Sequence, residues 1–152
     1  GLTPGVMREC YYLGILLIFL LAIWLKSGAV VYAIFFGMRL LSLPAFTEAV
    51  LTTSAGYGFL LLGHMIGAGF AILVFSMSVV SFPMMVDRGI DFISALITSI
   101  RTVRLNPALM LGWGAFIGLA LLAGFLTFFI GLMIVLPLLG HASWHLYRRL
   151  VM

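Results

Sequence analysis

Long apolar runs separated by short polar stretches dominate the chain, over residues 11–37, 55–82 and 107–147. Lys26 is the only formally charged residue inside these runs. A helix rises about 1.5 Å per residue, so about 20 residues cross the roughly 30 Å of hydrocarbon in a bilayer. Each run is long enough for that, and none shows the short alternating segments of a membrane β-barrel. The pattern predicts an all-α integral membrane protein.

The last run is too long for one crossing and is expected to fold back on itself. Its stretch from Gly124 to Gly131 is the predicted turn, and Pro137 is a candidate kink in the helix that follows. The chain then has four transmembrane helices, at about 11–37, 55–82, 107–124 and 130–147. The first has an alternative, in which the span stops near Leu25 and residues 29–41 lie along the membrane interface.

The stretch from Arg39 to Thr53 connects the first two spans. Pro44 is expected to break helical continuity there, and Thr47 followed by Glu48 is expected to begin a short surface helix. Because serine favours the position before a helix, we expect Ser54 to cap the second span.

Residues 91–105 carry a different pattern, with apolar and polar positions on opposite sides of a helix. The apolar side holds Phe92, Leu96, Ile100 and Val103, and the polar side holds Ser94, Thr98, Arg101 and Thr102. Asp91 is a good N-cap, so we predict an amphipathic helix lying in the membrane plane. The alternative is a connector packed on the other helices. Asn106 and Pro107 then predict the start of the next helix, with the asparagine as its cap.

Composition narrows the class of protein. Apolar residues make up 64% of the chain and charged residues 8%, whereas soluble domains carry about 25% charged residues. We therefore expect one membrane domain over residues 1–152, in contact with the lipid bilayer and without a soluble domain. The single cysteine, Cys10, cannot form an intrachain disulfide and says nothing of the redox compartment.

The distribution of basic residues predicts orientation. With both ends inside, one side of the membrane holds six arginines against one, Arg39, on the other side; the six are Arg8, Arg88, Arg101, Arg104, Arg148 and Arg149. This asymmetry favours a cytoplasmic location for both ends. The net charge of +4 reflects these membrane-flanking residues, and no basic stripe with interleaved aromatic residues indicates a nucleic-acid partner.

Two glycine pairs predict close helix contacts. Gly63 with Gly67, and Gly114 with Gly118, each place two glycines one turn apart on a helix face. Because such faces let helices approach closely in lipid, they are candidate packing surfaces. Contact within this chain and contact with another membrane protein both remain open.

The three histidines are the candidates for a cofactor or metal. His141 and His145 are four residues apart on one helix face, and His64 lies in the second span. We nevertheless expect that this chain alone holds neither haem nor metal. His64 and His141 are expected to be buried and hydrogen-bonded, with His141 bonded to a neighbouring helix.

Other polar residues suit the membrane interface. Trp144, Tyr147 and His145 resemble an interfacial belt, together with the basic residues Arg101, Arg104, Arg148 and Arg149. Lys26 is an intramembrane charge that snorkels or faces a partner. All four carboxylates lie at or beyond the ends of spans, and no catalytic or phosphate-binding motif is present, so we expect neither an enzyme nor an ion pump.

Three stretches in the second half carry a family resemblance, namely Ser81–Arg101, Asn106 with Pro107, and Leu136–Arg148; a looser likeness extends through Leu51–Phe59 to the first span. In these stretches the chain resembles the DUF2189 family of bacterial integral membrane proteins of unknown function. The resemblance implies an inner-membrane location and no established active site. It also implies that this chain is the C-terminal portion of a longer protein with a further membrane part before it, in agreement with the missing initiator methionine.

The functional expectation follows from two features of the sequence: it has no catalytic motif and no carboxylate inside a span, and it offers glycine-rich faces and a largely apolar surface for packing. We expect a non-catalytic accessory or assembly subunit of a larger inner-membrane complex, respiratory or photosynthetic, with other membrane subunits as partners. One alternative is a small transporter or channel using Lys26 and the histidines. A second is a haem- or metal-binding membrane subunit that uses His64, His141 and His145.

Overall fold

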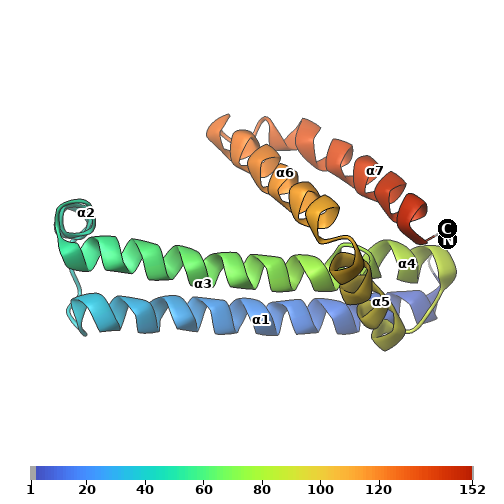
Figure 1. Ribbon diagram of the computed structural model, residues 1–152, viewed down its shortest axis with the longest axis horizontal. Helices are drawn as coiled ribbons and strands as arrows, with labels where there is room; N and C mark the ends of the chain where they lie inside the picture. The colour runs from blue at the N-terminus through green and yellow to red at the C-terminus, as the bar shows by residue number, and fades with distance from the viewer. Residues whose placement is uncertain (1–2, 152) are drawn as a thin grey trace. The chain divides into compact units, whose positions relative to one another are not determined.

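The computed structural model describes residues 3–151, and these residues form helices joined by short connections, without a strand (Figure 1). The helices are α1 (Pro4–Phe36), α2 (Leu43–Thr52), α3 (Ser54–Ser78), α4 (Ser81–Arg88), α5 (Phe92–Leu105), α6 (Pro107–Leu126) and α7 (Leu132–Val151). The predicted all-α class is confirmed.

Three helical segments among the described residues are long and apolar enough to cross a membrane: Pro4–Phe36, Ser54–Arg88 and Pro107–Leu126. The protein is therefore a multi-pass membrane protein. The predicted fourth span falls on α7, which is not among these segments. This helix carries two histidines, His141 and His145, and in its last turn Arg148 and Arg149, which lower its hydropathy.

The described residues form two compact units. Unit 1 contains residues 3–14 and 74–151, and unit 2 contains residues 15–73. The long helices α1 and α3 each contribute to both units.

In unit 2, α1 passes Leu25 without a break and ends at Phe36, directly before Gly37, where φ is 71°. The alternative required the first span to stop near Leu25, with residues 29–41 along the membrane interface. The structure has no helix end near Leu25. A cluster of four aromatic rings then joins α1, α2 and α3, with centroid distances from 5.3 to 6.4 Å between Tyr32, Phe36, Phe46 and Phe59. This cluster stabilises the end of the unit at which α2 connects the two long helices.

Two predictions about α2 and α3 were wrong. Pro44 does not interrupt a helix but lies in the first turn of α2, where a missing N–H costs nothing, so this helix begins before Thr47. The cap of α3 is not Ser54 but Thr53, whose hydroxyl accepts a hydrogen bond from the Gly56 N–H at 3.0 Å. Serine and threonine are both good caps, and the sequence alone did not select between neighbours.

In unit 1, a buried cluster of Val80, Met84, Val103, Met110 and Tyr147 joins α5, α6 and α7 to the segment from Val80 through α4. The left-handed Gly89, at φ 62°, ends α4. These contacts hold the short helices α4 and α5 against the base of the α6–α7 pair.

The start of α5 matches its prediction, and its faces match it in part. Asp91 is the N-cap, and its carboxylate accepts a hydrogen bond from the Ser94 N–H at 2.9 Å. Thr102, expected on the polar outer side, is buried together with Ser99. The outward side carries Ile93 and Ile97, which are about 60% exposed. The inward side also holds Val103, as expected of the apolar side, together with Ala95.

The junction between α5 and α6 assigns Asn106 another role. Pro107 begins α6 as predicted, but the Asn106 side chain makes no cap hydrogen bond to that helix. Its Nδ2 donates to the Thr102 carbonyl at 3.4 Å, at the end of α5. The predicted N-cap is therefore wrong, because the side chain is directed back to the preceding helix.

Candidate functional site

Ser99 makes a deeply buried polar contact in unit 1 between helices far apart in the sequence. Its hydroxyl donates to the Ser76 carbonyl at 2.7 Å and accepts from the Val80 N–H at 3.2 Å. The side chain is fully buried on α5. Because α3 ends at Ser78, Ser99 supplies hydrogen bonds to backbone groups at that helix end, where the regular pattern of helical hydrogen bonds stops.

A second long-range bond joins α4 to α7. The Tyr147 hydroxyl donates to the Asp87 carboxylate at 2.9 Å. Its ring is buried in the core cluster, whereas Asp87 is exposed. Tyr147 was expected to belong to an interfacial belt; its ring packs in the core cluster, and its hydroxyl reaches an exposed carboxylate.

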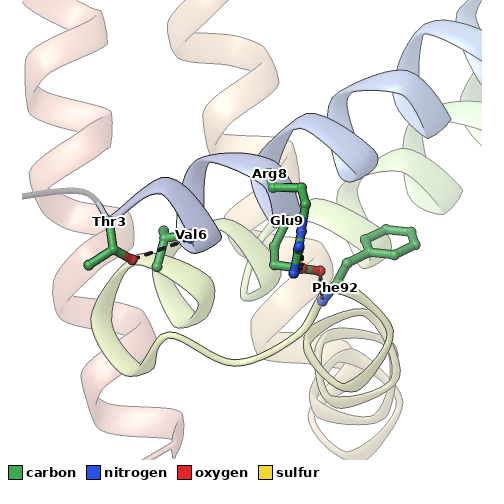
Figure 2. A network of polar contacts seen from close by, with 5 residues as sticks. All are labelled: Thr3, Val6, Arg8, Glu9 and Phe92. Atoms are coloured by element: carbon green, nitrogen blue, oxygen red, sulfur yellow. Dashed lines mark hydrogen bonds and ion pairs between the residues drawn. The ribbon is translucent and has the colours of Figure 1, made fainter.

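Two carboxylates meet the N-terminus of α5, and Figure 2 shows one of them, Glu9, beside Phe92. Glu9, on α1, accepts a hydrogen bond from the Phe92 N–H at 3.0 Å and pairs with Arg8 at 3.1 Å. Asp91 accepts from Ser94, and this backbone hydrogen bond is the main reason that the pKa of Asp91 is lowered. Negative charge is favourable at a helix N-terminus, where unpaired N–H groups and the helix dipole are positive.

Unit 2 has a hollow between α1 and α3, with a volume of about 170 Å³. It is lined by Trp24, Leu25, Ser27, Gly28, Val31, Gly63 and Ile66. The lining is apolar except for Ser27, whose hydroxyl donates to the Trp24 carbonyl of its own helix at 2.7 Å. Such a lining suits apolar side chains or acyl chains and offers no group for acid–base chemistry.

The four predicted packing glycines differ in their surroundings. A methyl group at Gly67 would lie 3.8 Å from the Trp24 indole, and one at Gly114 would lie 3.5 Å from the Phe75 ring. At Gly63 and Gly118, an added methyl group would meet nothing within 4 Å. One glycine of each pair therefore faces a partner within the chain, and the other is uncovered.

Glycines outside these pairs make the closest approaches. A methyl group at Gly58 would lie 2.5 Å from the Phe35 ring, and one at Gly56 would overlap the carbonyls of Ala49 and Val50. A search for glycines four residues apart did not identify Gly56 and Gly58. Gly56 is close to its neighbours because it lies at the corner between α2 and α3, and Gly58 because the large Phe35 ring lies against it.

The histidines lie apart and on the surface. His64 is exposed in unit 2, and its Nδ1 is 2.7 Å from the Leu60 carbonyl of its own helix. His141 and His145 are exposed on α7 in unit 1. The expected burial of His64 and His141 was wrong, and within residues 3–151 no hydrogen bond joins His141 to a neighbouring helix. Those residues also contain no group of three His, Cys, Asp or Glu side chains arranged to hold a metal.

The remaining predicted residues are mostly exposed. Lys26 is exposed on α1 and does not line the hollow. In unit 1 the exposed arginines lie on two helices, with Arg101 and Arg104 on α5 and Arg148 and Arg149 on α7. Trp144 is half-buried against the core cluster, with its ring centre 5.6 Å from that of Tyr147.

Several residues with distinctive contacts were not singled out by the sequence. Glu9, Ser99 and Asp87 were each ordinary polar residues until the fold brought their partners close. Trp113 was not singled out either. Its indole N–H is buried, and no acceptor among residues 3–151 reaches it. None of these contacts carries a local motif, so the sequence held no signal for them.

A family model described as a predicted integral membrane protein (DUF2189) matches residues 3–87. Of the stretches on which the resemblance rested, the match includes Leu51–Phe59 and the beginning of Ser81–Arg101, and the rest lie beyond it. Neither the curated proteins nor the solved structures contain a match to the chain. Since the matched region covers more than half of the chain, this protein belongs to the DUF2189 family of predicted integral membrane proteins.

Proposed function

We propose that this protein is a non-catalytic accessory or assembly subunit of a larger complex in the bacterial inner membrane, respiratory or photosynthetic. The observation that carries the proposal is the hollow between α1 and α3, where Gly28 and Gly63 leave backbone uncovered. Helices associate in lipid through close backbone approach at small residues. A helix of a partner protein placing apolar side chains in this hollow would gain that contact.

The uncovered surface extends beyond the hollow. A methyl group would meet nothing within 4 Å at Gly14, Gly28, Gly63, Gly69, Gly112, Gly118 or Gly140. Glycine lowers helix stability relative to alanine, so bare glycines on helices suggest contacts that lie outside this chain. These positions favour a packing role over a chemical one.

The proposed topology places both ends of the chain in the cytoplasm. It has four membrane-embedded helices, α1, α3, α6 and α7, with α5 in the inner interface. The exposed arginines of unit 1 support this orientation, because basic residues concentrate on the cytoplasmic side. Arg101 and Arg104 lie on the same exposed face of α5 as Ile93 and Ile97, so this face would meet the anionic head groups through its arginines and the adjoining apolar boundary through its isoleucines.

Cysteine labelling from each side tests the topology. In a Cys10→Ser background, Ser42→Cys should react with a membrane-impermeant maleimide from the periplasm, and Thr98→Cys from the cytoplasm. Labelling of both positions from the same side would disprove the arrangement.

Co-purification in mild detergent at native expression tests the function. The unmodified chain should carry a stoichiometric membrane partner, and Gly63→Leu should lose it because the new side chain fills the hollow. Leu61→Phe is the matched control, since it adds bulk to a side chain already exposed on α3. If the unmodified chain runs alone and crosslinks to no other protein, the proposal is wrong.

A further inference from the structure

The turn between α6 and α7 is apolar and outward-facing. It runs from Thr127 to Gly131, and Phe128, Phe129 and Ile130 within it are 89%, 62% and 70% exposed. Figure 1 shows α6 and α7 as a hairpin with this turn at its tip. From Pro107 to Gly140 the chain has no charged residue and no histidine. A turn in water would expose these aromatic and aliphatic side chains at a considerable cost.

The backbone of the turn largely satisfies its own hydrogen bonds. The N–H groups of Phe128, Ile130 and Leu132 donate to carbonyls three residues earlier, at 3.1 to 3.2 Å. The Thr127 hydroxyl accepts from the Gly131 N–H at 3.1 Å and donates to the Gly124 carbonyl at 2.9 Å. Hydrocarbon supplies no hydrogen bonds, so a turn can reside there only when its polar groups are paired internally.

The backbone conformation points the same way. Phe128 and Phe129 have φ of 52° and 68°, in the left-handed region that glycine and asparagine adopt most easily. A water-exposed turn would gain by having those small residues here. Two phenylalanines at strained positions indicate that large apolar side chains are required at the tip.

Length limits how far the tip can reach. Arg148 and Arg149, in the last turn of α7, mark the head-group level at the base of the hairpin. The 20 residues of α6 rise about 30 Å, but from Arg148 back to Gly131 α7 rises only roughly 25 Å at about 1.5 Å per residue, so α7 is the arm that limits the depth of the tip to less than the roughly 30 Å of hydrocarbon. Any tilt shortens this depth further.

We propose that α6 and α7 form a re-entrant hairpin, which enters the membrane from the side of its arginines and ends inside the hydrocarbon. The acyl chains of the lipids cover Phe128, Phe129 and Ile130, and the turn has no aqueous face. This inference concerns unit 1 alone and does not depend on the proposed partner.

Labelling of the purified full chain in liposomes tests the hairpin, in a Cys10→Ser background and at about one chain per vesicle. Phe128→Cys and Ile130→Cys should stay unlabelled by an impermeant maleimide on both sides and react only after denaturation in sodium dodecyl sulfate. Ser42→Cys and Thr98→Cys are the controls, because each should react from one side. Reaction of either tip cysteine from the aqueous phase, at a rate like that of Ser42→Cys, would overturn the proposal.

A nitroxide at Phe128→Cys, attached before reconstitution, gives a second readout that does not depend on thiol reactivity. Its relaxation should be enhanced by dissolved oxygen, which partitions into hydrocarbon, and hardly by a water-soluble nickel chelate. The opposite order would place the tip in water. No other protein is present and the chains are dilute, so protection of the tip under these conditions comes from lipid. If the tip were protected only at high protein density, a second copy of the chain would be covering it, and the proposal would be overturned.

Discussion

The Glu9 carboxylate, near the start of α1, accepts a hydrogen bond from the Phe92 backbone N–H at the first residue of α5, 83 positions later. The Glu9 side chain is 16% exposed, so this bond is largely shielded from water. It ties the N-terminal segment of unit 1 to a helix that follows α3 and α4. The same carboxylate also pairs with Arg8, which is exposed.

Removing this carboxylate is expected to destabilise the protein. Glu9→Ala should lower the free energy of unfolding by about 1 kcal/mol, the typical effect of losing a helix cap. Glu9→Gln keeps an acceptor oxygen but loses the charge, so its effect should be smaller, about 0.5 kcal/mol. Unfolding in mixed detergent micelles measures both.

Glu48→Gln is the control for these variants. Glu48 is exposed on α2, and no hydrogen bond of its carboxylate is found within residues 3–151. Its substitution should leave stability unchanged. Equal loss of stability in Glu9→Gln and Glu48→Gln would show that the contact with Phe92 contributes nothing.

Asp91 predicts a dependence of stability on pH. Its pKa is lowered in the folded protein, mainly by the hydrogen bond from the Ser94 N–H. A lowered pKa means that the stabilisation is fully present above the ordinary aspartate pKa, near 4, and is lost as the pH falls through the lower folded value. NMR titration of the Asp91 carboxyl should show the lowered pKa, and Asp91→Asn should reduce the loss of stability below about pH 4. A titration at the ordinary value would contradict the prediction.

Local signals in the sequence located the helices well. The cap at Asp91, the start of α6 at Pro107 and the turn after Leu126 each depend on residues within one or two helical turns. Such features follow from the conformational preferences and hydrogen bonding of a few neighbouring residues, so a single sequence contains them.

Contacts between distant residues could not be predicted in this way. Ser99 was unremarkable in the sequence, and His64 and His141 were expected to be buried because polar groups in lipid need partners. The structure buries Ser99 and leaves both histidines exposed, because burial depends on which helix faces another. The inward face of α5 was predicted only in part for the same reason, since Val103 of the apolar side is buried as expected but Ser99 and Thr102 are buried as well.

Ser99 provides a stability prediction. In Ser99→Ala the Val80 N–H loses its hydrogen-bond acceptor inside the core, so stability should fall by about 1–3 kcal/mol. Thr98→Ala is the control on the same helix, because the Thr98 hydroxyl donates to the Ser94 carbonyl one turn earlier, and its loss should have little effect. Unfolding midpoints in mixed micelles compare the two variants, and a larger effect at Thr98 would contradict the assignment.

Gly56 and Gly69 lie on the same helix, α3, and should respond to alanine in opposite ways. A methyl group at Gly56 would overlap the Ala49 and Val50 carbonyls at the corner between α2 and α3, where backbone rather than a flexible side chain would have to move. Gly56→Ala should therefore cost about 1–3 kcal/mol, as overpacking typically does. At Gly69 a methyl group meets nothing within 4 Å, so Gly69→Ala should be neutral or stabilise the isolated chain by up to about 1 kcal/mol through helix propensity. Unfolding in mixed micelles distinguishes them: a loss at Gly69 as large as that at Gly56 would mean that the face of α3 around Gly69 is already covered in the isolated protein.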